Sequence, residues 1–285
     1  NDGGFIVAWA SWAQDDIDDN YGIYTQRFDA SSNPVGTETQ VNTYTQGGQG
    51  GISTAGLSNG GYIVTWESYE QDGDDWGIYA QRFDANSDKV GNEFLVNTYI
   101  TGYQSRSDVT ALLDGGYVIT WRSYQQDGNA SGIYAQRYDV NGIKVGNEFL
   151  VNTVTESTQS FPSITALTDG GYVITWHSKY QDGSYYGIYG QRYDVNGKAL
   201  ASGQVNTYTL NSQSDPSVTS LNDGGFIVTW ESWAQDGDHW GIYAQRFDAN
   251  SDKMGNEFLV NRITDERQDN PVISSLNDGG FVISW

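Results

Sequence analysis

Apolar and polar residues alternate in a segment that recurs five times along the chain. In each copy, Gly-Ile-Tyr-x-Gln-Arg is followed by an aromatic residue and Asp, so small or polar residues separate the apolar ones. This two-residue period predicts a β-strand with contacts on both faces, which Gly opens and Asp ends. The five copies are 22–29, 77–84, 132–139, 187–194 and 241–248.

A second alternating segment ends at a tryptophan each time and indicates an internal repeat. In 169–176, Asp-Gly-Gly precedes Tyr-Val-Ile-Thr-Trp, and closely similar residues recur at the other places. The tryptophans are 54 to 57 residues apart, at Trp9, Trp66, Trp121, Trp176, Trp230 and Trp285. A nearly fixed interval of this length is typical of proteins built from repeated structural units.

Each repeat has room for four short strands separated by turn sequences. In one repeat the expected strands are 162–167, 172–178, 187–193 and a weaker one that ends at 205–206. The turns between them contain Asp-Gly-Gly, Gln-Asp-Gly and Asp-Val-Asn-Gly, which are typical of hairpins and loops. The first strand is expected to start at a proline in three repeats, at Pro162, Pro216 and Pro271.

Four antiparallel strands per repeat predict an all-β chain, namely a β-propeller of four-stranded antiparallel blades. We expect five or six blades in a single domain over 1–285, built from repeats of about 55 residues. A β-solenoid is the alternative, although its coils are usually shorter and have fewer hairpins. The chain starts and stops in the second strand of a repeat. Either its two ends complete one shared blade, or it is a segment of a longer chain.

Composition and charge narrow the classes of partner. The net charge is −22, which disfavours nucleic acids and anionic membranes because their phosphates would be repelled. No apolar run approaches the roughly 20 residues of a membrane span. Cysteine is absent, which excludes disulfides and thiolate metal sites. Cations and neutral polar ligands such as glycans fit this charge.

Arginine occupies one position of the repeat in this otherwise acidic chain. An isolated buried guanidinium is costly, so we expect these arginines to contact carboxylates or backbone carbonyls rather than bulk solvent. The four arginines to which this prediction applies are Arg82, Arg137, Arg192 and Arg246.

The longest loops bring aromatic and acidic residues to one face of the expected propeller. They follow the second strand of each repeat, share a face with the loops between repeats, and combine flat rings with carboxylates, as sugar recognition requires. The candidate ligand-binding residues are Trp12, Tyr69, Asp72, Trp76, Tyr124, Asp127, Tyr180, Asp182, Tyr186, Trp233, Asp236 and Trp240. The alternative is that the carboxylates fix the loops and the rings fill gaps between blades.

A run of carboxylates in the first long loop is the candidate metal site, with calcium as its cofactor. Asp15, Asp16, Asp18 and Asp19 lie within five residues, and an insertion lengthens this loop relative to the others. Repeated Asp-x-Asp or Asp-x-Asn sequences, such as Asp72-x-Asp74, resemble the start of a calcium loop but lack its later carboxylate. A hydrated acidic loop without metal is the alternative, and it is favoured at any single loop.

Catalysis is not expected. Each acidic position singled out recurs across the repeats, so none of them is marked as a unique general acid or nucleophile. The Asp-box of sialidases is not matched by these Gln-Asp-Gly loops.

Four segments of the last complete repeat carry a resemblance to a known kind of repeat: 223–230, 235–237, 241–248 and 255–261. Together they resemble the repeats of very large secreted bacterial surface proteins of the RTX or adhesin kind. The resemblance covers essentially the whole chain and implies an extracellular setting at the cell surface. It implies no particular ligand, and the calcium-binding nonapeptide of RTX proteins is absent.

These observations predict a non-catalytic extracellular module that binds glycans or other cell-surface polymers through the long-loop face. The first alternative is a structural spacer or filament unit that associates with itself through its repeats. The second is a glycan-processing enzyme.

Overall fold

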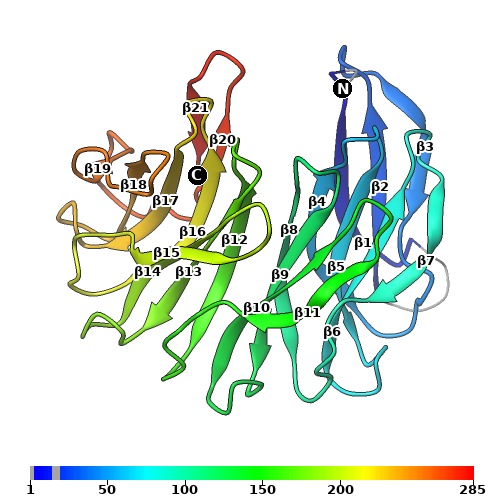
Figure 1. The fold of residues 1–285 in the computed structure, drawn as a ribbon, viewed down its shortest axis with the longest axis horizontal. Helices are drawn as coiled ribbons and strands as arrows, with labels where there is room; N and C mark the ends of the chain where they lie inside the picture. Colours follow the sequence, from blue (N-terminus) through cyan, green and yellow to red (C-terminus); the bar gives the residue numbers. More distant parts are fainter. Residues whose placement is uncertain (1–2, 15–19) are drawn as a thin grey trace. The chain divides into compact units, whose positions relative to one another are not determined.

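The computed structural model describes residues 3–14 and 20–285, and its regular structure consists of β-strands (Figure 1). The candidate metal ligands Asp15, Asp16, Asp18 and Asp19 lie outside the described residues. In the described part of the chain, no helix is long and apolar enough to cross a membrane.

The strands form a series of antiparallel sheets in which consecutive strands are neighbours. The first sheet joins β1 (Phe5–Trp12), β2 (Tyr21–Phe28) and β3 (Pro34–Gln40). The second joins β4 (Gln49–Gly56), β5 (Tyr62–Tyr69), β6 (Trp76–Phe83) and β7 (Lys89–Leu95). The third joins β8 (Gln104–Ala111), β9 (Tyr117–Tyr124), β10 (Ser131–Tyr138) and β11 (Lys144–Leu150).

The remaining sheets continue the same order. The fourth joins β12 (Gln159–Ala166), β13 (Tyr172–Lys179), β14 (Tyr186–Tyr193) and β15 (Ala199–Gln204). The fifth joins β16 (Gln213–Ser220), β17 (Phe226–Trp233), β18 (Trp240–Phe247) and β19 (Phe258–Leu259), and the last joins β20 (Val272–Ser275) and β21 (Phe281–Ser284). The prediction of four antiparallel strands in each complete repeat is confirmed.

The first strand of a repeat starts earlier than the sequence predicted. β12 starts at Gln159, and Pro162 lies inside it at a β-bulge between Ser160 and Ser163. Phe161 has a φ of 55° at this bulge, and Pro216 occupies the corresponding bulge of β16. A bulge removes the need for a ladder N–H at the proline, so the strand extends on its N-terminal side. Only Pro271, immediately before β20, lies at the predicted start.

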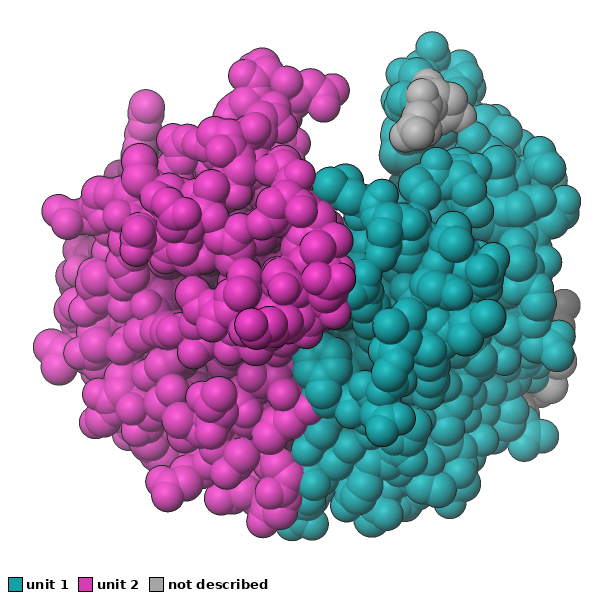
Figure 2. Space-filling model, in the orientation of Figure 1, with its two compact units in different colours: residues 1–126, 134–149 teal, residues 127–133, 150–285 magenta. Residues whose placement is uncertain are grey.

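The chain divides into two compact units, each with its own core (Figure 2). Unit 1 comprises Asn1–Gln126 and Tyr134–Phe149, and unit 2 comprises Asp127–Ile133 and Leu150–Trp285. In unit 1, Trp66 is fully buried among Tyr62, Phe83 and aliphatic side chains. In unit 2, Trp230 has the same role beside Phe226 and Phe247.

Aromatic pairs across neighbouring strands hold each blade together. The rings of Tyr62 and Phe83 stack with centroids 4.6 Å apart, and those of Phe226 and Phe247 stack at 4.7 Å. Such a pair contributes about 0.5–1.5 kcal/mol beyond its buried area. These two repeated aromatic positions therefore belong to the core of their repeats.

The prediction for the repeated arginines is confirmed. Arg137 and Arg192 each donate to an aspartate of the preceding turn at 2.6 Å, and Arg246 forms an ion pair with Asp223. Arg82 instead donates to two backbone carbonyls of the next repeat, at Val140 and Asn141.

Candidate functional site

Aromatic residues pair across the last register position of the second and third strands in several blades. In unit 1, Trp12 lies opposite Tyr21 with ring centroids 5.0 Å apart, and Tyr69 lies opposite Trp76 at 5.3 Å. In unit 2, Trp233 and Trp240 meet edge to face at 5.3 Å. The alternation along each strand brings both rings of a pair to the same side of the hairpin.

At least one ring of each of these pairs is open to solvent. In the first pair both Trp12 (55% exposed) and Tyr21 (47% exposed) are open. In the other two pairs Tyr69 and Trp233 are exposed, whereas Trp76 and Trp240 are half-buried. Large aromatic rings are usually buried, so their recurrence on the surface at one position of the repeat makes them the candidate functional site. We call the three pairs Trp12–Tyr21, Tyr69–Trp76 and Trp233–Trp240 the loop-face aromatic pairs.

The other predicted aromatic residues do not form such a pair. Tyr124 lies opposite Ser131 in the repeat and stacks on Tyr103 of the preceding loop at 4.7 Å. In the fourth repeat Lys179 occupies the paired position, so Tyr180 lies one residue further along and meets Tyr185 at 6.1 Å.

Tyr186, opposite Lys179, packs on His177 with ring centroids 4.5 Å apart. His177 is buried and also meets Phe161, at 4.9 Å. Tyr186 therefore takes part in internal packing, whereas Tyr180 is exposed.

The four predicted aspartates of the Gln-Asp-Gly loops point into their own loops. One carboxylate oxygen of each accepts a backbone N–H two residues later, as between Asp182 and Ser184 at 3.0 Å. The other oxygen lies within 3.0 Å of where a Cβ on the first glycine of the next strand would be. The pairs are Asp72 with Gly77, Asp127 with Gly132, Asp182 with Gly187 and Asp236 with Gly241. Burial raises the pKa of Asp72 above its usual value. This placement fits a loop-fixing role.

A second acidic residue in these loops supports the loop that follows. Asp74 accepts the backbone N–H of Gly102 at 2.9 Å, and Asp238 accepts that of Glu266 at 3.1 Å. Their carboxylates are therefore engaged in hydrogen bonds. Among residues 3–14 and 20–285, no group of three or more acidic or histidine side chains is arranged to hold a metal ion.

A glutamate on the outer strand connects these loops, and the sequence analysis did not identify it. The Glu93 carboxylate accepts the N–H of Thr43 at 2.5 Å and of Tyr44 at 3.1 Å, and the side-chain amide of Gln71 at 2.8 Å. Glu257 makes the corresponding three bonds in unit 2. The signal was present as the repeated Gly-Asn-Glu-Phe sequence. These glutamates thus bind the loops that carry the Tyr69–Trp76 and Trp233–Trp240 pairs.

The residue after the repeated tryptophan differs in chemical type from one repeat to the next. Glu67, Arg122, His177 and Glu231 occupy it. Burial raises the pKa of Glu67 and of Glu231 above the usual range. Each of these glutamates accepts a backbone N–H from the next repeat, Glu67 from Arg106 at 2.5 Å and Glu231 from Asn270 at 3.3 Å. The sequence pattern did not mark this position, because its residue changes from repeat to repeat.

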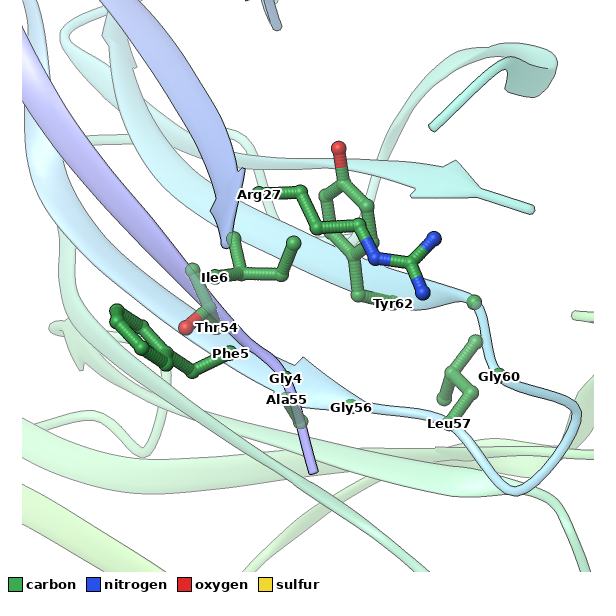
Figure 3. Close-up of a pocket in the computed structure, with 11 residues that line it drawn as sticks. Gly4, Phe5, Ile6, Arg27, Thr54, Ala55, Gly56, Leu57, Gly60 and Tyr62 are labelled. Atoms are coloured by element: carbon green, nitrogen blue, oxygen red, sulfur yellow. The ribbon is translucent and has the colours of Figure 1, made fainter. Parts of the chain in front are cut away.

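Unit 1 has two hollows whose linings differ. A shallow depression of about 510 Å³ lies beside the exposed ring of Tyr69, bordered by Glu70, Asp74 and Asp75. Hydrogen bonding to Glu70 raises the pKa of the Tyr69 hydroxyl. A second hollow, of about 390 Å³, is lined by Phe5, Ile6, Arg27, Tyr62 and glycines near the opposite turns (Figure 3). Arg27 donates from there to the carbonyl of Ala85, so this second hollow surrounds a structural arginine.

Comparisons with known proteins establish the fold. No protein-family model and no curated protein matches the chain. A protein of unknown function from Dyadobacter fermentans is similar in structure, with a TM-score of 0.64 and 13% identity over 95% of this chain and 83% of that one. An α-L-arabinanase of Penicillium chrysogenum, solved with arabinobiose, has a TM-score of 0.62 and 15% identity over 92% of this chain and 80% of that one. A Hadza microbial sialidase has a TM-score of 0.60 and 9% identity over 96% of this chain and 59% of that one.

At these low identities the similarity concerns the fold alone. The chain has the all-β fold of the five-bladed β-propellers, with blades of four antiparallel strands. Glycan-processing enzymes and a protein of unknown function share this fold.

Proposed function

We propose that this chain is a non-catalytic glycan-binding module of a secreted bacterial surface protein. The observation that carries the proposal is the recurrence of the loop-face aromatic pairs, each with at least one ring open to solvent. A pyranose ring packs its C–H face on such an indole or phenol, and neighbouring carboxylates accept its hydroxyls. Glu70 and Asp75 border the ring of Tyr69.

Repetition also suggests the mode of binding. Several shallow, similar sites bind individual sugars weakly, and a polymer that engages two or more of them gains affinity through high effective concentration. We therefore expect polysaccharides on a cell surface to bind better than isolated mono- or disaccharides.

A glycan array, followed by titration of the best polysaccharide, tests the proposal. Tyr69→Ala combined with Trp233→Ala is expected to weaken binding at least tenfold, because each substitution removes one stacking surface. Phe258→Ala is the matched control, since Phe258 is an exposed aromatic residue on β19 outside the loop-face pairs. Binding that is equally strong in all three proteins would contradict the assignment.

A glycan-processing enzyme is the second candidate, favoured by the fold shared with an arabinanase and a sialidase. The measurement is release of reducing sugar from arabinan and of sialic acid from sialylated oligosaccharides. We expect no release above a heat-denatured control. Measurable release would replace the binding proposal with the enzymatic one. A protein that binds no glycan and forms oligomers in light scattering would instead favour the spacer.

We further propose calcium as a ligand of the first long loop, through Asp15, Asp16, Asp18 and Asp19. Four carboxylates within five residues repel one another unless solvent or a cation compensates them. Calorimetric titration with calcium should give saturable heat for the wild type and none for Asp16→Asn combined with Asp18→Asn. Equal heats from both proteins would remove this loop as a site.

A further inference from the structure

The outer strand of the fourth repeat departs from the others in a way that opens a pocket in unit 2. In β7 of unit 1, Phe94 lies opposite Ala80. At the corresponding register in unit 2, Gly203 of β15 lies opposite Gly190 of β14. Both positions have thus lost side chains that their counterparts in β6 and β7 retain.

The role of the missing ring can be seen in unit 1. The ring of Phe94 packs against Tyr138 of the next repeat, with centroids 5.6 Å apart. Phe247 is the counterpart of Tyr138 in unit 2, and glycine replaces the ring that would face it. Phe247 is 6% exposed, against 1% for Tyr138. The absent phenyl group leaves a hollow beside Phe247.

This hollow is a pocket of about 270 Å³ between the fourth and fifth repeats. Its walls include Val173, Val205, Phe226 and Phe247, which are all buried and apolar. A Cβ built on Gly203 would have no atom within 4 Å, which confirms that the space is open at this point. The volume is at the lower end of the range for ligand sites, so it suits one ring rather than an oligosaccharide.

The rim of the pocket carries charged side chains of both signs, namely Arg192, Lys253 and the carboxylate of Asp252. Arg192 lines it and is held by Asp169 at 2.6 Å and by the carbonyl of Ala249. Lys253 also lines it, and burial lowers the pKa of its ammonium group. In unit 1 the corresponding Lys144 donates to the carbonyl of Val96 at 2.9 Å, whereas Lys253 makes no such hydrogen bond within the described residues.

We propose that this pocket binds a single aromatic ring that carries a carboxylate, with the ring beside Phe247 and the carboxylate at Lys253. The ring takes the place that Phe94 fills in unit 1, where a phenyl group fits between two repeats. The Lys253 ammonium can pair with a carboxylate that a neutral ring lacks, so an aromatic acid is expected to bind better than a neutral ring even though Asp252 also lines the pocket. This site is separate from the loop-face aromatic pairs and does not depend on glycan binding.

Binding of benzoate and of benzyl alcohol, followed by ligand-observed NMR, tests the proposal. The wild type is expected to bind both in a saturable way, with benzoate at least tenfold tighter. Gly203→Phe should abolish binding of both probes without lowering the Tm, because it restores the ring found in β7. Phe258→Ala, on the outer strand of the next repeat, should bind as the wild type does.

Two further variants complete the test. Gly190→Ala adds a methyl group that makes only ordinary contacts at 3.6 Å, so it should fold and weaken both probes several-fold even if Gly203→Phe does not fold. Lys253→Met should reduce benzoate binding to the level of benzyl alcohol. No saturable binding by the wild type, or unchanged binding in folded Gly203→Phe or in Gly190→Ala, would overturn the pocket. Unchanged benzoate binding in Lys253→Met would overturn the carboxylate assignment.

Discussion

At the scale of single residues, the repeated glycines are required where a backbone or a carboxylate comes close. Gly171, the second glycine of an Asp-Gly-Gly turn, has the carbonyl oxygen of Tyr193 where its Cβ would be. Gly170 before it has a φ of 89°, in the left-handed region that favours glycine. The Asp-Gly-Gly sequence thus reflects two different steric demands on adjacent residues.

Gly171→Ala should destabilise the protein by about 1–3 kcal/mol, because the added methyl group meets a backbone atom that cannot rotate away. Gly203→Ala is the matched control, since nothing lies within 4 Å of its built Cβ. Chemical denaturation of both variants measures the difference. Equal stability of the two variants would show that the turn at Gly171 can relax.

Glu231 is a residue whose charge should make stability depend on pH. Burial raises its pKa in the folded protein, although Ser214 donates to it at 2.8 Å and Asn270 at 3.3 Å. The folded state therefore holds this proton more tightly than the unfolded state does. The stabilisation is fully present below the unfolded pKa of about 4.5 and is lost as the pH rises through the folded pKa.

Glu231→Gln removes this titration. The free energy of unfolding of the wild type, minus that of the variant, should decrease as the pH rises from about 4.5 towards neutrality. Urea denaturation at several pH values provides the comparison and cancels the other titrating groups. A difference that stays constant, or increases with pH, would contradict the raised pKa.

At the scale of the elements, one outer strand fixes the loops of two repeats. Glu257 of unit 2 precedes β19 and accepts hydrogen bonds from Thr207, from Tyr208 and from the side chain of Gln235. The first two donors belong to the preceding repeat and the third to the Gln-Asp-Gly loop. The loop that carries the Trp233–Trp240 pair is therefore bound by a residue just before β19, outside that loop.

Glu257→Ala should destabilise the protein by about 2 kcal/mol, because two backbone N–H groups and one amide lose a charged acceptor. Hydrogen exchange at Thr207 and Tyr208 should become faster at the same time. Ser202→Ala is the control, because Ser202 precedes Gly203 as Glu93 precedes Phe94. Unchanged exchange at both amides in Glu257→Ala would mean that the loops are held by other contacts.

At the scale of the whole molecule, arginines join successive repeats. Arg192 binds Asp169 of its own repeat and the carbonyl of Ala249 in the next one. Its side chain is 10% exposed, whereas that of Arg246, which binds only Asp223 in the described structure, is 44% exposed. The repeated arginine is therefore expected to contribute more to the free energy of unfolding at Arg192 than at Arg246.

Arg192→Met should lower the free energy of unfolding by about 1–3 kcal/mol, because a charge-assisted bridge between repeats is lost. Arg246→Met should cost less than about 1 kcal/mol, as expected for a solvent-screened pair. Thermal and chemical denaturation of the two variants provide the test. A larger effect at Arg246 would contradict the ranking.

Repetition made much of this protein predictable. The strand around Trp230 and the arginine contacts followed from residue identity and period, because the same local pattern is satisfied in every repeat. The exposure of Trp12 and Trp233 did not follow, because a ring in a loop can also fill a gap between blades. The direction in which Asp72 and Asp236 point did not follow. An aspartate in a loop can face solvent or its own backbone, and that depends on whether the neighbouring strand starts with a glycine close enough to receive it.

The sequence by itself determined the all-β class, the four-stranded repeat and the positions of the aromatic rings, because alternation and turn residues act over a few neighbouring positions. Only the tertiary structure decided what Glu93 binds and what the missing ring at Gly203 leaves open. Both depend on contacts with residues about 20 to 50 positions away in sequence. Such contacts are set by how one repeat packs on the next, and no local pattern records that geometry.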